Sequence, residues 1–296
     1  MQSSYLWIND LRTHYLHWGS ASSGQTVLLL HGLASNARIW DGVARQLMDV
    51  GLAPIAPDAR GHGLTDKPDG DYGLETFLRD LLVFMDAAHL EQPFLVGHSW
   101  GGLLALEYAA RFPIGPRAPA GLVLVDGGFT QMDQFPGATW ELMRERLTPP
   151  KLAGTPVEVF LSMVGATSQK WQPDDHAIQA ILANFEISTD EAIYPHLSLE
   201  HHLQILRSIW EYQTHARFER VRCPVLMIPA SSPSPLSAEE TAFLELKRKG
   251  VMQAQLKISD LRVHWMDETI HDIPLQRPVE LASLMAEFVA EVMERR

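Results

Sequence analysis

Short apolar runs recur along the chain and are separated by stretches with helical periodicity. Candidate strands lie at 27–30, 52–57, 94–96, 121–125, 224–228 and 261–265, and 27–30 is a continuous apolar run. A continuous apolar run of this length is typical of a strand that is buried on both faces. Between two of the runs, one helix face carries Phe77, Leu81, Phe84 and Met85. Strands that alternate with helices predict an α/β fold in which helices cover both faces of a parallel sheet.

The alternation stops after Val125. Residues 127–222 contain no convincing strand, and Thr155, Pro156 and Glu158 have the spacing of a helix-start capping box. Three apolar stripes at helical spacing follow, at 157–164, 178–185 and 199–210. The segment is too long for a simple loop, so we predict a helical insertion. It is either a packed helical subdomain or a lid over a site at the strand ends, and the two interpretations are compatible.

Composition and charge narrow the class of protein. The 296 residues are 46% hydrophobic and 20% charged, which excludes a disordered chain, a collagen and a long coiled coil. The net charge of −12 argues against a nucleic-acid-binding protein. Cys223 is the single cysteine, so no intrachain disulfide forms. No apolar run reaches ~18 residues and no signal-peptide pattern opens the sequence, so we expect a cytoplasmic protein without a membrane span. The sequence indicates no oligomeric state.

The strongest chemical motif is G-x-S-x-G at 97–101, with Ser99 at its centre. It follows a predicted strand and precedes the helix-like stretch 103–108, which is the context that a nucleophile elbow requires. Gly97 and Gly101 leave room for a tight turn. The turn also places Ser99 at a helix N-terminus, where free N–H groups favour a developing negative charge. A second turn at His31 and Gly32 ends the first apolar run. We predict that the backbone N–H groups of Leu33 and Trp100 form an oxyanion hole.

Four motifs together resemble the α/β-hydrolase superfamily: His31-Gly32, PDARGHG at 57–63, GHSWGG at 97–102, and IHD at 270–272. The resemblance implies an eight-stranded, mostly parallel sheet with a helical cap inserted after the sixth strand. It implies a catalytic domain formed by residues 1–128 and 216–296, and a cap or lid domain formed by residues 129–215.

A serine nucleophile needs a base and an orienting carboxylate. The resemblance implies that His271 is the base, because the family carries it in the loop after the last strand. In many relatives the acid follows the seventh strand, but 229–235 contains no acid here. Asp126, at the end of the sixth predicted strand, is therefore our candidate, as in some haloalkane dehalogenases. Three acids remain as alternatives: Glu239, Glu240 and Asp267.

The sequence also suggests a substrate pocket and argues against a cofactor. Apolar side chains of the cap are candidates for the pocket roof, with core packing as the alternative: Trp140, Met143, Met163 and Trp210. No metal-ligand spacing and no Gly-rich phosphate loop are present, so we expect no metal and no cofactor.

These features predict a cofactor-free serine hydrolase, similar to carboxylesterases, that acts on a small-molecule ester or related acyl substrate through Ser99, His271 and Asp126. Serine at the elbow argues against haloalkane dehalogenases and epoxide hydrolases, which use a carboxylate nucleophile. A lactonase, a proline iminopeptidase-like enzyme and a carbon–carbon bond hydrolase remain alternatives on the same triad. So does a non-catalytic protein with this fold that binds a small ligand.

Overall fold

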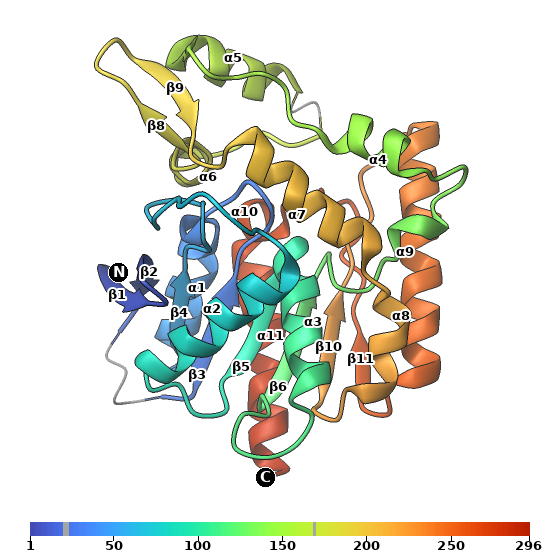
Figure 1. Ribbon diagram of the computed structural model, residues 1–296. Coiled ribbons are helices and arrows are strands. Elements are labelled where there is room, and N and C mark those ends of the chain that lie inside the picture. The colour runs from blue at the N-terminus through green and yellow to red at the C-terminus, as the bar shows by residue number, and fades with distance from the viewer. Residues whose placement is uncertain (20–23, 168–169) are drawn as a thin grey trace.

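The protein is described by a computed structural model that defines residues 1–19, 24–167 and 170–296. Helices cover both faces of a central sheet, and the segment between β6 and β10 lies across one end of it (Figure 1). Among the helices that the structure describes, none is both long and apolar enough to cross a membrane.

The central sheet has eight strands in the order β1-β2-β4-β3-β5-β6-β10-β11. β1 and β2 form an antiparallel hairpin, β2 pairs antiparallel with β4, and all later neighbours pair in parallel. This confirms the predicted eight-stranded, mostly parallel sheet. Its strands are β1 (Gln2–Ile8), β2 (Leu11–His17), β3 (Thr26–Leu30), β4 (Ala53–Pro57), β5 (Phe94–His98), β6 (Gly121–Val125), β10 (Val225–Ile228) and β11 (Leu261–Val263).

Two hydrophobic cores lie on opposite faces of the sheet. Successive residues of β5 alternate between them: Phe94 and Val96 face one core, and Leu95 faces the other. Burial on both faces explains why these strands read as continuous apolar runs. One face is covered by α1 (Asp41–Asp49), α10 (Ile273–Gln276) and α11 (Pro278–Glu294). The other is covered by α2 (Leu74–Ala87), α3 (Trp100–Arg111) and α9 (Ala238–Lys257).

β4 is an inner strand although it contains Pro54 and Pro57. Its first half pairs with β3 and its second half with β2, and the two pairings share only Ile55. Each proline therefore has a strand partner on one side only. Its missing N–H costs little because the other side forms no strand pairing at that residue.

The segment between β6 and β10 contains strands as well as helices, which corrects the expectation of a purely helical insertion. A separate antiparallel sheet has the order β7-β9-β8. Each of its strands is at most four residues long, too short for an alternating pattern to stand out in the sequence. The elements are η2 (Met132–Gln134), α4 (Trp140–Leu147), β7 (Thr155–Pro156), α5 (Val157–Thr167), α6 (Asp175–Leu182), β8 (Phe185–Ile187), β9 (Ala192–Pro195), α7 (Leu199–Glu211), α8 (Thr214–Arg217) and η3 (Phe218–Arg220). One further short 3₁₀ helix, η1 (Ala37–Trp40), precedes α1.

The predicted capping box at Thr155 is wrong because this residue belongs to the short strand β7. Thr155 and Pro156 pair with β9, and the N–H of Val157 donates to the carbonyl of Glu191 at 2.8 Å. The helix α5 therefore begins at Val157, and tertiary strand pairing overrides a local helix-start signal. Similarly, Phe185 belongs to β8 and does not extend the stripe of α6.

Candidate functional site

Ser99 sits at a sharp turn between β5 and α3 with φ 54° and ψ −120°. A non-glycine residue in this region is strained and is held there by its surroundings. The N–H of Ser99 donates to the carbonyl of Val125 at 3.0 Å. A Cβ on Gly97 would lie 2.2 Å from the carbonyl oxygen of Gly101, and one on Gly101 would lie 2.5 Å from that of His31. Close backbone approach thus requires both glycines of the motif.

Three side chains from distant parts of the chain form a continuous hydrogen-bonded row. Nε2 of His271 lies 2.9 Å from Oγ of Ser99, and Nδ1 of His271 lies 2.6 Å from Oδ2 of Asp126. A carboxylate only accepts hydrogen bonds, so Nδ1 carries the proton and the lone pair of Nε2 faces the serine hydroxyl. The structure therefore brings together the three residues predicted as nucleophile, base and acid.

The Asp126 carboxylate is completely buried and accepts three hydrogen bonds. Oδ1 accepts the N–H of Ala230 at 2.9 Å, and Oδ2 accepts from Nζ of Lys247 at 2.8 Å as well as from His271. Burial alone favours the neutral acid, but the charge of Lys247 and the bond from His271 outweigh it. They lower the pKa of Asp126 to about 2. Asp126 is thus an anion throughout the neutral range.

His271 lies at the end of a loop that closes onto the elbow. Burial lowers the pKa of His271, whereas the hydrogen bond and the charge of Asp126 raise it by a larger amount. The net shift of the pKa is therefore upward. Its backbone carbonyl lies 2.9 Å from Nε2 of His98, which donates to it. The His98 ring is buried, and this burial, together with the neighbouring His271, lowers the pKa of His98 to about 4. A neutral His98 therefore ties the loop that carries His271 to the end of β5.

The alternative acids are not hydrogen-bonded to His271, although Glu240 borders the same cavity as Ser99. Glu239 pairs with Arg146, and Glu240 pairs with Lys170 while its carboxylate also caps the start of α9. Asp267 is exposed and offers its backbone carbonyl to the hydroxyl of Thr269. Among these acids and Asp126, the structure places Asp126 alone in contact with His271.

The predicted oxyanion donors border Ser99. Leu33 and Trp100 line the same cavity as Ser99. Trp100 is the first residue of α3, where a backbone N–H has no intrahelical acceptor. A Cβ on Gly32 would come within 3.2 Å of Cβ of Ser99, so the loop that leads to Leu33 passes directly beside the serine.

Two buried histidines hold this loop. Nδ1 of His31 donates to the carbonyl of Gly32 at 2.7 Å, and its Nε2 accepts the N–H of Ala59 at 3.0 Å. Nδ1 of His62 donates to the carbonyl of Arg60 at 2.9 Å, and its Nε2 accepts the N–H of Ala34 at 3.3 Å. Burial lowers the pKa of both rings, that of His62 to about 3. Both therefore act as neutral braces between the two loops.

A cavity of about 450 Å³ opens over Ser99. Its floor includes Ser99 and His271, and α9 contributes Phe243, Leu244 and Lys247. The segment between β6 and β10 supplies mostly apolar side chains to its wall: Met132, Leu147, His202, Leu206 and Ile209. A second cavity of about 670 Å³ borders the first at His202 and lies between that segment and the loops that contain Ala34 and His62.

The four predicted pocket residues do not line the cavity over Ser99, and that part of the prediction is wrong. Met143 and Trp210 pack in a small core against Leu246 of α9. The guanidinium group of Arg207 covers the ring of Trp140 at 4.9 Å, and 43% of Met163 is exposed. Two of the four side chains thus pack against α9, and helical spacing does not show which element an apolar face contacts.

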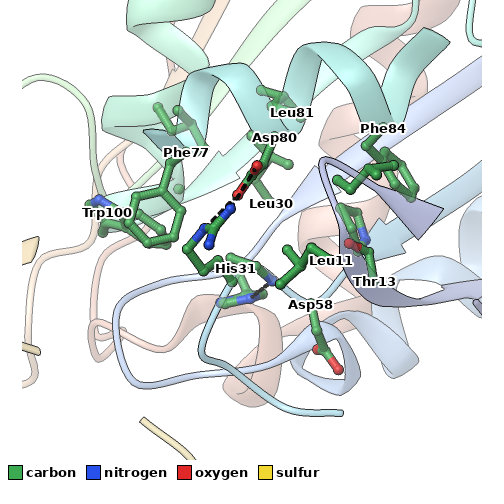
Figure 2. Close-up of a pocket in the computed structure, with 16 residues that line it drawn as sticks. Leu11, Thr13, Leu30, His31, Asp58, Phe77, Asp80, Leu81, Phe84 and Trp100 are labelled. Carbon is green, nitrogen blue, oxygen red and sulfur yellow. Dashed lines mark hydrogen bonds and ion pairs between the residues drawn. The ribbon is translucent and has the colours of Figure 1, made fainter. Parts of the chain in front are cut away.

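A separate cavity of about 40 Å³ lies between α2 and the sheet. Figure 2 shows residues that line it, among them His31, Phe77 and Trp100. The Arg60 guanidinium lines it and forms two bonds with Asp80, at 2.8 and 3.1 Å. The ion pair ties the loop that contains Arg60 and His62 to α2.

Sequence reasoning missed Lys247 and His202. Lys247 contacts Asp126 across 121 residues of sequence. His202 borders both large cavities, and Nε2 donates to the carbonyl of Leu147 at 3.0 Å. No local motif marks either residue, because each becomes important only through tertiary packing. In the described ranges 1–19, 24–167 and 170–296, no group of three His, Cys, Asp or Glu side chains is arranged to hold a metal ion.

Comparison with known proteins agrees with this architecture. The sequence profile of the alpha/beta hydrolase fold matches residues 25–160. A haloalkane dehalogenase of Mesorhizobium japonicum is 39% identical over 106 residues, which is 36% of this chain and 33% of that protein. An uncharacterised protein of Mycobacterium tuberculosis is 39% identical over 116 residues, or 38% of this chain and 32% of that protein. The matched region thus spans about a third of the length of these relatives.

Among solved structures, E-2-(acetamidomethylene)succinate hydrolase superposes with a TM-score of 0.78 at 21% identity, over 98% of this chain and 99% of that one. The enol-lactonase of Burkholderia xenovorans superposes with a TM-score of 0.66 at 18% identity, over 98% and 100% of the two chains. At these identities the likeness concerns the fold. The profile match, the similar fold over nearly the whole chain and the observed strand order show that the protein has the alpha/beta hydrolase fold.

Proposed function

We propose that the protein is a serine hydrolase, similar to carboxylesterases, that cleaves an ester or related acyl bond of a small to medium, largely apolar molecule. The observation that carries the proposal is the row Ser99–His271–Asp126, which opens into a cavity of about 450 Å³. A strained serine, a base within hydrogen-bond distance and a buried anion behind the base are the parts that acyl transfer requires.

In the proposed reaction, Oγ of Ser99 attacks the carbonyl carbon of the substrate while Nε2 of His271 accepts the hydroxyl proton. The imidazole becomes an imidazolium between the serine and Asp126. Asp126 stabilises that cation and keeps Nδ1 protonated, so that Nε2 remains free to act as the base. The proton on Nε2 then passes to the leaving group, and an acyl-serine remains.

The N–H groups of Leu33 and Trp100 would stabilise the negative oxygen that forms in the attack. The first turn of α3 adds the partial positive charge of a helix N-terminus. In the second half of the reaction, His271 takes a proton from water, the hydroxide attacks the acyl-serine, and Ser99 regains its proton as the acid leaves.

We further propose that residues 1–128 and 216–296 form the catalytic domain and that residues 129–215 form a cap domain. The apolar wall that this segment contributes to the cavity supports the division, because it would enclose an apolar substrate and exclude water. The C-terminal end of this segment is tied to α3, because the hydroxyl of Tyr212 donates to Glu107 at 2.9 Å. Arg217, just after the segment, donates to the same carboxylate through Nε at 2.7 Å.

The test is Ser99→Ala, compared with Ser283→Ala, which alters an exposed serine of α11. We expect Ser99→Ala to lower kcat by ~10⁴- to 10⁶-fold and to abolish labelling by a fluorophosphonate probe. Ser283→Ala should match the wild type in both. The assay uses p-nitrophenyl esters of increasing chain length, lactones and amides, so it also identifies the preferred acyl bond. Turnover by Ser99→Ala within tenfold of the wild type would refute the proposal.

A further inference from the structure

Lys247 holds an unusual place for a lysine, because its ammonium group contacts the carboxylate behind the base. It extends from α9 and donates to Oδ2 of Asp126 at 2.8 Å and to the carbonyl of Ala230 at 2.9 Å. Its side chain is only 17% exposed, and the carboxylate of Asp126 is fully buried. The N–H of the same residue, Ala230, donates to the other oxygen of Asp126. Lys247 thus links Asp126 to Ala230, and the backbone N–H of Ala230 in turn donates to Asp126.

We propose that Lys247 is a positioning residue of the active site, whose fixed positive charge beside the His271–Asp126 pair sets the pH range over which His271 can act as a base. The proposal deepens the proposed hydrolase function and rests on it, because it concerns the readiness of the same base.

His271 and Lys247 bind the same oxygen of Asp126. Oδ2 of Asp126 accepts from Nδ1 of His271 at 2.6 Å and from Nζ of Lys247 at 2.8 Å. The negative charge that would stabilise the imidazolium is therefore shared with the ammonium group of Lys247. The two positive groups are then within ~4–6 Å, the range over which a neighbouring charge shifts a pKa by about one unit or more.

The opposing influences on His271 have known directions. Burial lowers its pKa, the bond and charge of Asp126 raise it above the ordinary value, and the charge of Lys247 brings it part of the way down again. The titratable and charged groups that face His271 come from four elements: Asp126 at the end of β6, Asp272 before α10, His98 of β5 and Lys247 of α9. His98 has a pKa of about 4 and is neutral near pH 7. Of these four groups, Lys247 therefore supplies the positive charge.

A purely structural role is the competing explanation, since Lys247 also ties α9 to Ala230. The two explanations differ in what happens to the charge. A structural tie predicts a loss of stability without a change in the titration of His271. An electrostatic role predicts that any neutral replacement raises the pKa of His271, even one that can still donate a hydrogen bond.

The experiment compares Lys247→Met, Lys247→Gln and Lys247→Arg with Lys249→Met, which removes an exposed lysine two residues away on α9. The titration of His271 is followed by NMR through its Cε1–H signal, identified by its loss in His271→Gln. The pH dependence of kcat/KM for p-nitrophenyl acetate is measured in parallel.

We expect the Met and Gln variants to raise the midpoint of the His271 titration by about one pH unit. The acidic limb of kcat/KM should move to higher pH with it, because the base is then protonated over a wider range. Lys247→Arg and Lys249→Met should leave the midpoint in place. If the Met variant does not fold, the Gln variant alone decides.

An unchanged midpoint in the neutral variants overturns the proposal, even if turnover or stability falls, because Lys247 would then be a structural tie only. The NMR titration needs no turnover, so it separates this proposal from the proposed function. A protein that hydrolyses no ester but shows the shifted midpoint would refute the esterase function and support the electrostatic role of Lys247.

Discussion

Asp126→Asn is the most informative single change to the site, because it keeps the size of the side chain and reverses part of its hydrogen bonding. All three partners of the carboxylate are donors: Ala230 N–H, Lys247 Nζ and His271 Nδ1. An amide has one oxygen and one NH₂ group. Whichever way it is turned, its NH₂ group faces at least one of these donors, and the negative charge is gone.

Asp126→Asn should affect both turnover and stability. If the amide NH₂ faces Nδ1, His271 must take the tautomer that presents a proton to Ser99, so it cannot act as a base. A wrong tautomer lowers kcat by about 10⁴-fold. Lys247 also loses its counter-charge while its side chain stays largely buried. Breaking a buried pair by removing one partner costs about 3–5 kcal/mol of unfolding free energy.

The assay measures kcat on p-nitrophenyl acetate and the unfolding free energy in urea for Asp126→Asn, Lys247→Met and the double variant. The double variant should recover part of the stability lost in Asp126→Asn, because the orphaned charge is removed. It should recover no activity, because His271 still lacks its anion. Asp267→Asn is the matched control, since that exposed carboxylate does not contact His271.

Near-normal turnover by Asp126→Asn, together with an inactive Asp267→Asn variant, would refute this reasoning. It would mean that the row seen here is not the arrangement used in the reaction and that Asp126 only caps the strand end. Strictly additive stability losses in the double variant would contradict the idea that Lys247 depends on Asp126.

Two further changes test the geometry and the electrostatics of the site. In Gly127→Ala, the new Cβ would lie 2.1 Å from the carbonyl oxygen of Ser99, so we expect a loss of about 1–3 kcal/mol in urea unfolding. Gly165→Ala, in α5 with open space around it, should instead gain about 0.5–1 kcal/mol, and equal signs for the two would contradict this account. The pKa of Asp126 is about 2 when folded, below its ordinary 3.8, so its ionisation adds about 2 kcal/mol that is present above about pH 4 and lost as pH falls toward 2. The stability difference between wild type and Asp126→Asn, measured in urea at each pH, should shrink over that range, and a constant difference would count against a depressed pKa.

The doubly buried strands were readable from sequence, and the amino-terminal hairpin was not. All six predicted strands correspond to strands of the central sheet, and β3, β5, β6 and β10 are buried on both faces. β11 is an edge strand in which Arg262 is exposed. In β1 and β2 the pattern is misleading: Trp7 is 70% exposed, whereas Thr13 and His14 are buried. His14 is buried because Asp58 accepts a bond from its ring at 2.7 Å, a contact across 44 residues that no local pattern encodes.

Some parts of the candidate site could likewise be predicted from the sequence, and others could not. Ser99 lies in a motif whose glycines are demanded by local backbone geometry, so sequence alone located it. Asp126 and His271 followed from chain order and strand ends. The cavity wall did not follow, because an apolar stripe shows that a face is buried but not whether it meets a core or an open space. Met143 and Leu206 are both buried residues of helices in the inserted segment, and only Leu206 faces the cavity.

The paired hydrogen bonds of His31 and His62 have a spectroscopic consequence. Each ring already uses one nitrogen as a donor and the other as an acceptor of a backbone N–H, so a second proton would have to displace an amide. Burial lowers the pKa of His31, and the pKa values of His62 and His98 are about 3 and about 4, so the rings of His62 and His98 stay neutral as the pH passes from 8 to 5. The pKa of His271 is shifted the other way. Among these four rings, that of the base alone has a raised pKa, so its signal reports the protonation of the site.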